Sequence, residues 1–403
     1  MSGCYAVAGW WGGRWEEAAV AGWAEGLRNR LGRPASLGLL FVTPGWADRA
    51  AALLEILQLH ARVPVLAGCT TSTVIAGAQE FEGRGGFALG LYALPGSEVR
   101  AFHVRQLDVE QATEPAWWEA RTGVRREESR GWLAFMDPLT LDVDTWLKGW
   151  NRAYPGVPVV GGLAGADIRR DSTLLFLNQE VLEEGGVVVS LAGEVELLTV
   201  VAQGCMPIGE TWTLTRVEQN LIHQIGNRPA YEVLLSTVES LPVEQQERLG
   251  GNLFIGLAAD EYRDEFRQGD FLVRNLLGVD PNSGVLAVGA LPRPGQTVQF
   301  QCRDAAAADA ELRSLLGRVR GQLQDRVLYG GCLCVCNGRG RGLFGVSDHD
   351  ARMVQEELGP MGLTGLFCNG EIGPVGRTNH IHGYTASLGL LVSRSGARKG
   401  PDR

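Results

Sequence analysis

The stretch VPVLAGCTTST (residues 63–73) occurs a second time as VPVVGGLAGAD (157–167), and MGLTGLFCNGEIG (361–373) is a more distant third version. Each version follows an amphipathic helical pattern, and each helical pattern follows an apolar run, namely ASLGLLFVTPG (35–45), GWLAFMDPLT (131–140) and GGCLCVCNGRG (330–340). A further apolar strand completes each repeat, over residues 85–94, 187–194 and 386–395. A helix that joins two apolar strands is typical of a crossover in an α/β sheet. The sequence therefore predicts an α/β fold of repeated strand–helix–strand units, which form mixed sheets flanked by helices in two pseudo-related domains.

The chain between the second and third repeats sets the expected domain boundaries. Residues 213–242 predict a strand, a turn at Gly226-Asn227 and a helix, and residues 251–303 predict strands joined by turns. This middle part has more strand character than the repeats. We therefore expect a Trp-rich N-terminal segment over residues 1–30, a first domain over 31–208, a second over 209–395 and a disordered tail over 396–403.

Composition and charge exclude several classes of protein. With 403 residues and 45% apolar content, the chain can bury a large core. A net charge of −9 without a basic patch argues against nucleic acid as a partner. The N-terminus lacks the continuous apolar segment of a secretion signal, and no uncharged apolar run reaches the roughly 18 residues of a membrane span. We expect a soluble protein without membrane insertion.

The eight cysteines are dispersed along the chain and do not form the dense framework of a small disulfide-rich domain. This usage favours the cytoplasm. Cys332, Cys334 and Cys336 alternate, so on a strand their side chains would share one face. That spacing differs from the CxxC of metal and redox sites, and it predicts buried thiols.

Gly-rich turns at the ends of the repeat strands are the candidate binding sites, because ligands of α/β sheets lie beyond the carboxyl ends of strands. In the first repeat, Cys69, Thr70 and Thr71 offer open backbone and hydroxyl groups, or they simply form a tight turn. In the second repeat, Leu163 stands where the first has Cys69, and only Asp167 carries a functional group.

The third repeat is the strongest candidate, since opposite charges follow its two strands. Asn337, Gly338 and Arg339 could bind a carboxylate, although Arg339 could also be an ordinary surface residue. Glu371, after Gly370, could accept an ammonium group or cap nearby N–H groups. His380 and His382 could in principle bind a metal with Cys368 or Glu371. No repeated His/Cys spacing supports this, so we expect neither a metal nor a cofactor.

The motifs GGCLCVCNGRGRGLFG, GLFCNGEIGPVG and TNHIHGYTASLGLL follow one another toward the C-terminus, and in this order they resemble the FIST family of sensory domains. The resemblance extends over residues 30–395 and includes both N-terminal repeats. It implies a sensory protein that binds a small ligand such as an amino acid. The matching motif positions are Asn337, Gly338, Arg339, Gly370, Glu371, Asn379, His382 and Thr385.

Three functions remain in competition. The leading hypothesis is an intracellular sensor of an amino acid or related small polar acid, in which Arg339 holds the carboxylate and Glu371 the ammonium group. With no fused output domain expected, such a sensor needs a separate signalling protein. Alternatively, the tryptophans of residues 1–30 could dock a partner, which would make the protein a scaffold. A third hypothesis is a cofactor-independent amino-acid isomerase, or a hydrolase, that uses the thiols of Cys69 and Cys368.

Overall fold

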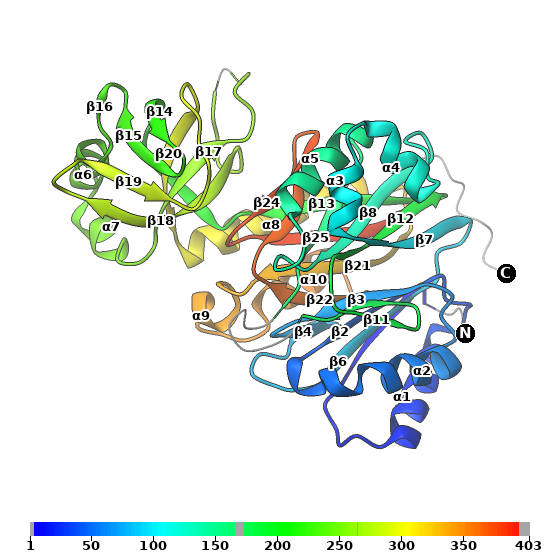
Figure 1. Cartoon of the computed structure of the whole chain (residues 1–403). Coiled ribbons are helices and arrows are strands. Elements are labelled where there is room, and N and C mark those ends of the chain that lie inside the picture. The colour runs from blue at the N-terminus through cyan, green and yellow to red at the C-terminus, as the bar shows by residue number, and fades with distance from the viewer. Residues whose placement is uncertain (1–3, 166–172, 264, 395–403) are drawn as a thin grey trace. The chain divides into compact units, whose positions relative to one another are not determined.

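The computed structural model describes residues 4–165, 173–263 and 265–394 (Figure 1). The chain forms two compact units. The first comprises residues 1–201, 313–381 and 385–403, and the second comprises 202–312 and 382–384. This division differs from the predicted ranges, because the chain returns to the first unit after residue 312 to build the third repeat. Asp167 and the predicted tail 396–403 lie outside the described residues.

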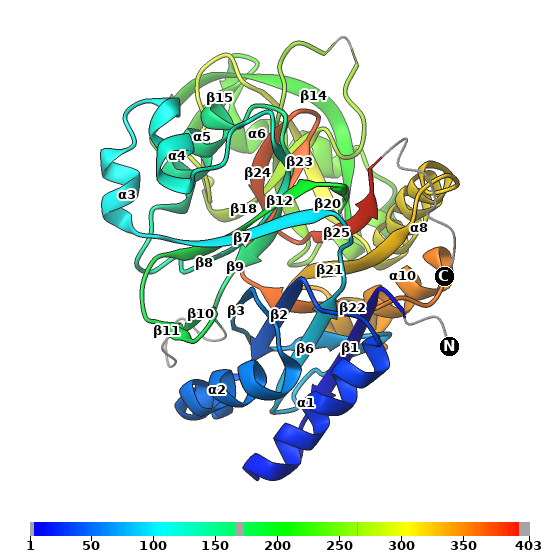
Figure 2. The ribbon, with the colours of Figure 1, turned by 90° about the vertical axis from the view of Figure 1, so that its right-hand side faces the viewer.

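The first repeat forms a mixed six-stranded sheet. In spatial order its strands are β1 (Ala6–Trp11), β6 (Phe87–Tyr92), β2 (Leu37–Val42), β3 (Leu66–Thr70), β10 (Leu175–Leu177) and β11 (Glu180–Leu182). One face is covered by α1 (Glu17–Leu31), the 3-10 helix η1 (Pro44–Arg49) and α2 (Ala50–Ala61), as Figure 2 shows for α1 and α2. Leu27 and Leu57 of these helices pack on Leu40 and Leu89 of the sheet. Apolar burial therefore fixes the helices on this face.

The tryptophans of the N-terminal segment belong to this packing. Trp11 meets Trp23 edge to face with 6.1 Å between ring centroids, and Trp15 meets Trp46 in the same way at 5.9 Å. All four rings lie against the core between the helices and the sheet. The N-terminal residues thus form β1 and α1 of the first sheet, which gives their aromatic rings a structural role.

The second repeat forms a sheet of the same design. Its strands in spatial order are β7 (Ser97–Val104), β12 (Gly186–Gly193), β8 (Ser129–Met136), β9 (Val159–Leu163), β23 (Glu371–Val375) and β24 (Thr378–His382). The accompanying helices are α3 (Gln106–Gln111), α4 (Pro115–Thr122) and α5 (Val143–Ala153). A cluster of aromatic rings holds α4 and α5 on the sheet, for example Trp132 and Trp150 with centroids 4.8 Å apart.

The third repeat forms a sheet in the order β13 (Val195–Ala202), β25 (Ala386–Ser393), β21 (Leu328–Cys336), β22 (Leu363–Cys368), β4 (Val74–Ala76) and β5 (Gln79–Glu80). The helix α8 (Ala305–Gln322) precedes it, and α9 (Gly340–Phe344) and α10 (His349–Leu358) follow β21. The inner faces of the three sheets share one core, in which Phe41, Phe135 and Cys334 are fully buried. The predicted fold of repeated strand–helix–strand units in mixed sheets is confirmed.

The three sheets exchange hairpins in a cycle. The hairpin β4–β5 of the first repeat pairs with β22 of the third, β10–β11 of the second repeat extends the first sheet, and β23–β24 of the third extends the second. Each repeat therefore completes the sheet of a neighbour. This arrangement gives the first unit an approximate threefold repetition and places the three pairs of parallel strands around a common core.

One glycine marks the same place in each repeat. A Cβ at Gly68, Gly161 or Gly365 would lie 1.7, 1.8 or 1.9 Å from the carbonyl oxygen of the neighbouring parallel strand. Counting from this glycine, Thr71 of the first repeat matches Cys368 of the third. Cys69 instead matches Gly162, so the comparison of Cys69 with Leu163 was off by one position. Cys69 and Cys368 occupy different positions in their repeats.

The second unit is built mainly from strands. They are β14 (Cys205–Glu218), β20 (Thr297–Arg303), β17 (Leu253–Ala258), β18 (Phe271–Asp280), β19 (Val285–Val288), β15 (Leu221–Ile225) and β16 (Arg228–Pro229), in spatial order. Because β14 also pairs with β15, the sheet closes on itself. Two helices accompany it, α6 (Ala230–Glu239) and α7 (Val243–Arg248). The predicted strand, turn at Gly226-Asn227 and helix are confirmed.

Candidate functional site

The carboxyl ends of the three parallel strand pairs meet in the first unit. Thr71 and Gly165 form a parallel β-bridge, with the Gly165 N–H donating to the Thr70 carbonyl at 3.0 Å. The Thr71 hydroxyl donates to the carbonyl of Phe367. These contacts join the ends of β3, β9 and β22, so the turns that follow the three repeats form one site.

Three exposed or half-exposed polar side chains lie at this meeting point, and we refer to Ser72, Asn337 and Asn369 as the strand-end cluster. The Ser72 hydroxyl donates to Asn337 Oδ1 at 2.6 Å, and Asn337 Nδ2 donates to Asn369 Oδ1 at 2.8 Å. Ser72 comes from the first repeat, whereas the two asparagines come from the third. Amide and hydroxyl groups both donate and accept hydrogen bonds, so the cluster can bind a small polar molecule.

Glu371 lies buried behind this cluster at the start of β23. It is fully buried, its Oε2 accepts the N–H of Thr385 at 3.1 Å, and its Oε1 accepts the thiol of Cys368 at 3.3 Å. Burial raises the pKa of Glu371 to about 8, although its hydrogen bonds and the charge of Arg339 act in the opposite direction. The carboxyl group is therefore mostly protonated at neutral pH. Cys368 links it to the cluster, because its carbonyl accepts the N–H of Asn337 at 2.9 Å.

The thiols proposed for catalysis are deeply buried. Cys69 and Cys368 are both fully buried. Burial raises the pKa of the Cys69 thiol, and burial together with the Glu371 carboxylate raises that of Cys368. A thiol needs a lowered pKa and access to solvent to act as a nucleophile or base. The environment of both cysteines thus favours the inert thiol form.

Arg339 is bound inside the protein. Its Nε and one terminal nitrogen donate to the two carboxylate oxygens of Asp350 at 2.7 and 2.9 Å, and both side chains are at most 1% exposed. Burial alone would raise the pKa of Asp350, but the charge and hydrogen bonds of Arg339 lower it to about 2. A bidentate pair of this kind anchors the loop after β21 to the first turn of α10. The side chain therefore holds the loop in place behind the strand-end cluster.

Other predicted residues also have partners within the protein. The Asn379 amide oxygen accepts the N–H of Val159 at 2.8 Å, and its nitrogen donates to the Val157 carbonyl at 3.0 Å, which ties β24 to β9. The Thr70 hydroxyl accepts the N–H of Leu174 at 2.9 Å. These side chains position the strands of the site.

Three of the remaining predicted residues contribute backbone groups, and the fourth belongs to the second unit. The Gly370 carbonyl accepts the N–H of Leu163 at 2.8 Å, and the Gly338 N–H lies 3.5 Å from the Cys336 sulfur. Thr385 contributes its N–H to Glu371. His382 is 3% exposed and belongs to the second unit.

The structure thus brings together Asn337, Glu371 and Thr71 from the predicted residues and adds three others. Ser72 and Asn369 adjoin predicted positions, and their polarity at a strand end was a usable signal. Asp350 lay eleven residues from Arg339 without a motif to connect them. Among residues 4–165, 173–263 and 265–394, no group of three or more His, Cys, Asp or Glu side chains could hold a metal ion.

Comparison with known sequences assigns the family. The FIST N domain matches residues 36–228, and the FIST C domain matches residues 230–374. The chain belongs to the FIST family. FIST domains are associated with sensory signal transduction. An uncharacterized FIST relative from Mycobacterium tuberculosis is 37% identical over 377 residues, or 93% of this chain and 96% of its own. Another relative, from Mycobacterium bovis, is 36% identical over 378 residues, which cover 93% of this chain and 95% of its own.

A solved structure, the cyanuric acid hydrolase from A. caulinodans, aligns with 97% of this FIST protein and 100% of its own chain. Its sequence identity is 11% and its TM-score is 0.31, and at this score the likeness supports no conclusion about fold or activity. Within the described parts of the chain, no helix has the length and apolar character needed to cross a membrane.

Proposed function

We propose that this FIST protein is a cytoplasmic sensor that binds an amino acid or a related small polar acid at the strand-end cluster. The observation that carries the proposal is the meeting of Ser72, Asn337 and Asn369 at the carboxyl ends of strands from two repeats. Ligands of α/β sheets bind at such ends. The three side chains offer donors and acceptors at the surface, which suits a ligand with a carboxylate and further polar groups.

We propose other roles for the two charged residues than the sequence analysis did. Asp350 occupies two donors of Arg339, and Glu371 is fully buried. We therefore assign the ligand carboxylate to the hydroxyl of Ser72 and the amides of Asn337 and Asn369. Arg339 and Glu371 support the turns from behind, and the neutral Glu371 leaves the site without a buried negative charge that would repel an acid.

The family's association with sensory signalling favours a sensor over an enzyme. Burial and the raised pKa of both proposed catalytic thiols weigh against the thiol-dependent isomerase or hydrolase. Packing of the N-terminal tryptophans within the first sheet weighs against a scaffold that docks through them. We propose that a separate signalling protein reads the ligand-bound state.

The test is a thermal-shift screen of amino acids and small carboxylic acids, followed by calorimetric titration of each compound that stabilises the protein. A ligand at 100 times its Kd stabilises the folded state by about 3 kcal/mol. We expect Asn337→Ala and Ser72→Ala each to weaken binding by about 3- to 10-fold, the value of one hydrogen bond. Asn282→Ala, in an exposed turn of the second unit, is the matched control. No stabilising compound, or equal binding by Asn337→Ala, would contradict the proposal.

A further inference from the structure

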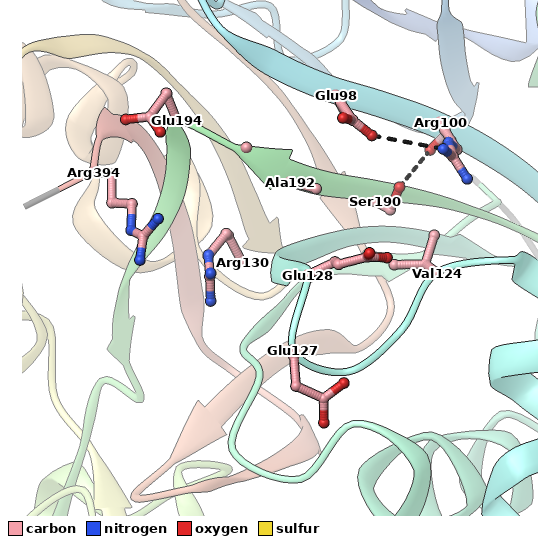
Figure 3. A pocket seen from close by; sticks show the side chains of 11 residues that line it. Glu98, Arg100, Val124, Glu127, Glu128, Arg130, Ser190, Ala192, Glu194 and Arg394 are labelled. Atoms are coloured by element: carbon pink, nitrogen blue, oxygen red, sulfur yellow. Dashed lines mark hydrogen bonds and ion pairs between the residues drawn. The ribbon is translucent and has the colours of Figure 1, made fainter.

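Figure 3 shows a pocket of about 260 Å³ in the first unit. It lies at the opposite end of the second sheet from the strand-end cluster. The ends of β7, β8 and β12 form it together with Arg394, which follows β25. Arg130 is the second residue of β8, and the other end of this strand pairs with the end of β9 at Met136 and Leu163, so the pocket is roughly 20 Å from the strand-end cluster. The pocket is therefore a separate feature of the molecule.

Charged side chains of both signs line this pocket, and some of them are already paired. Arg100 contacts Glu98 at 3.6 Å and donates to the Gly123 carbonyl at 3.2 Å. Glu128 forms an ion pair with Arg125. These groups have local partners and balance one another.

Four other charged groups of the lining have no such partner. The side chains of Arg130, Arg394, Glu127 and Glu194 form no hydrogen bond or ion pair with the rest of the described chain. Figure 3 shows Arg130, Arg394 and Glu194 toward one end of the view and the Arg100–Glu98 pair at the other. Two guanidinium groups and two carboxylates thus remain available to a ligand.

The backbone positions two of these side chains directly. On β8, Gly131 pairs with Leu191 and Ser129 pairs with Ala192, so Arg130 is the extra residue of a β-bulge. Bulges redirect a side chain and are frequent beside functional sites. The Nε of Arg130 is buried without a hydrogen-bond partner among the described residues. A buried guanidinium nitrogen without an acceptor is costly. Arg130 as a whole is half-buried and lines the pocket, so an anionic ligand group there would lie beside this uncompensated guanidinium.

The other arginine lies beside one of the carboxylates. The Arg394 N–H donates to the Glu194 carbonyl at 2.9 Å, so Arg394, which follows β25, lies next to the turn between β12 and β13 that contains Glu194. Guanidinium groups bind carboxylates through paired hydrogen bonds, while carboxylates bind ammonium groups. Two unpaired carboxylates in the lining would repel phosphate or another multiply charged anion. A molecule with one positive and one negative group satisfies both kinds of lining residue.

We propose that this pocket is a second ligand site, which binds a free amino acid as a zwitterion. Arg130 and Arg394 hold the carboxylate, and Glu194, which Figure 3 shows on the same side of the pocket as these two arginines, holds the ammonium group. Val124 and Ala192 supply the apolar part of the lining. The pocket volume suits a single small molecule of this class.

The test is calorimetric titration of the full chain with each standard L-amino acid at millimolar concentration. Propionate and ethylammonium serve as probes that carry one charge each. We expect at least one amino acid to bind, and both single-charge probes to bind on the order of 10-fold more weakly or worse. We also expect Arg130→Met to weaken amino-acid binding by a similar factor. Arg152→Met, at an exposed arginine outside the pocket, serves as the control.

Further variants keep the test decisive. Arg394→Met changes an exposed side chain and gives the same readout if Arg130→Met fails to fold. Asn337→Ala reports on the strand-end site and is expected to leave binding at the pocket unchanged. Absence of binding by every amino acid, or unchanged binding in both arginine variants, would overturn the pocket proposal. Loss of binding only in Asn337→Ala would overturn it too, while supporting the strand-end site.

Discussion

Replacing Glu371 by glutamine is expected to stabilise the protein at neutral pH. Below about pH 4.5 this carboxyl is protonated in both folded and unfolded chains. As the pH rises, the unfolded chain ionises first, whereas burial keeps the folded group protonated until about pH 8. The parent protein therefore loses stability as the pH rises from about 4.5 to about 8. At 1.36 kcal/mol per pH unit, the loss reaches about 3 kcal/mol at pH 7.

Glutamine keeps the shape of the site and removes the titration. Its amide oxygen can accept the Thr385 N–H, and its amide nitrogen can donate to the Cys368 sulfur, replacing the two present contacts. The stability of Glu371→Gln relative to the parent should thus increase by about 3 kcal/mol from pH 4.5 to pH 7. Glu80, another buried carboxyl whose pKa is about 8, titrates in both proteins and cancels in the comparison.

Thermal unfolding followed by tryptophan fluorescence measures this difference. Ten of the eleven tryptophans lie in the first unit, so the signal reports mainly on the unit that contains Glu371. At about 2 °C per kcal/mol for a unit of this size, the Tm difference should grow by about 6 °C between pH 4.5 and pH 7. Glu55→Gln, at an exposed position of α2, is the control. A Tm difference that does not change with pH would refute a buried, neutral Glu371.

Two further predictions concern the packing behind the site. Asp350→Asn leaves Arg339 buried without its carboxylate and should lower the free energy of unfolding by about 3–5 kcal/mol. Denaturant unfolding of the first unit measures this loss. A loss below about 1 kcal/mol would show that the pair is not buried. Gly161→Ala would place a Cβ 1.8 Å from the Ala134 carbonyl oxygen, so it should cost about 3 kcal/mol or more. Gly22→Ala, in α1 with open space around the added methyl, should instead stabilise by up to about 1 kcal/mol, and equal effects of the two glycine substitutions would contradict the strand register.

The repeats could be predicted from the sequence because the patterns that mark them are local. Apolar runs, helical periodicity and a glycine at each second strand recur within every copy. The exchange of hairpins was not predicted, since the sheet edge that accepts β4, β10 or β23 depends on strands far away in the chain. The same reason explains the domain division, because the third repeat returns to the first unit after the intervening strands.

The sequence indicated which turns form the candidate site. It did not indicate which of the charged side chains are buried and paired. Asn337 and Glu371 were identified from their positions after strands, and they lie at the meeting point of the repeats. The partner of Arg339 is a helix residue that no spacing rule connects to it, so burial of the guanidinium could not be foreseen. Arg130 and Arg394 are 264 positions apart in the sequence, and only the pairing of distant strands brings them to one pocket.

The most direct test of the sensory account is an experimental structure of the protein with a bound amino acid or small acid found by the thermal screen. The account predicts ligand density at the strand-end cluster, within hydrogen-bond distance of Ser72 and Asn337. Density confined to the pocket of Arg130 and Arg394 would support the second site and contradict the first. Density that contacts neither group of residues, from a ligand that binds in solution, would contradict both assignments.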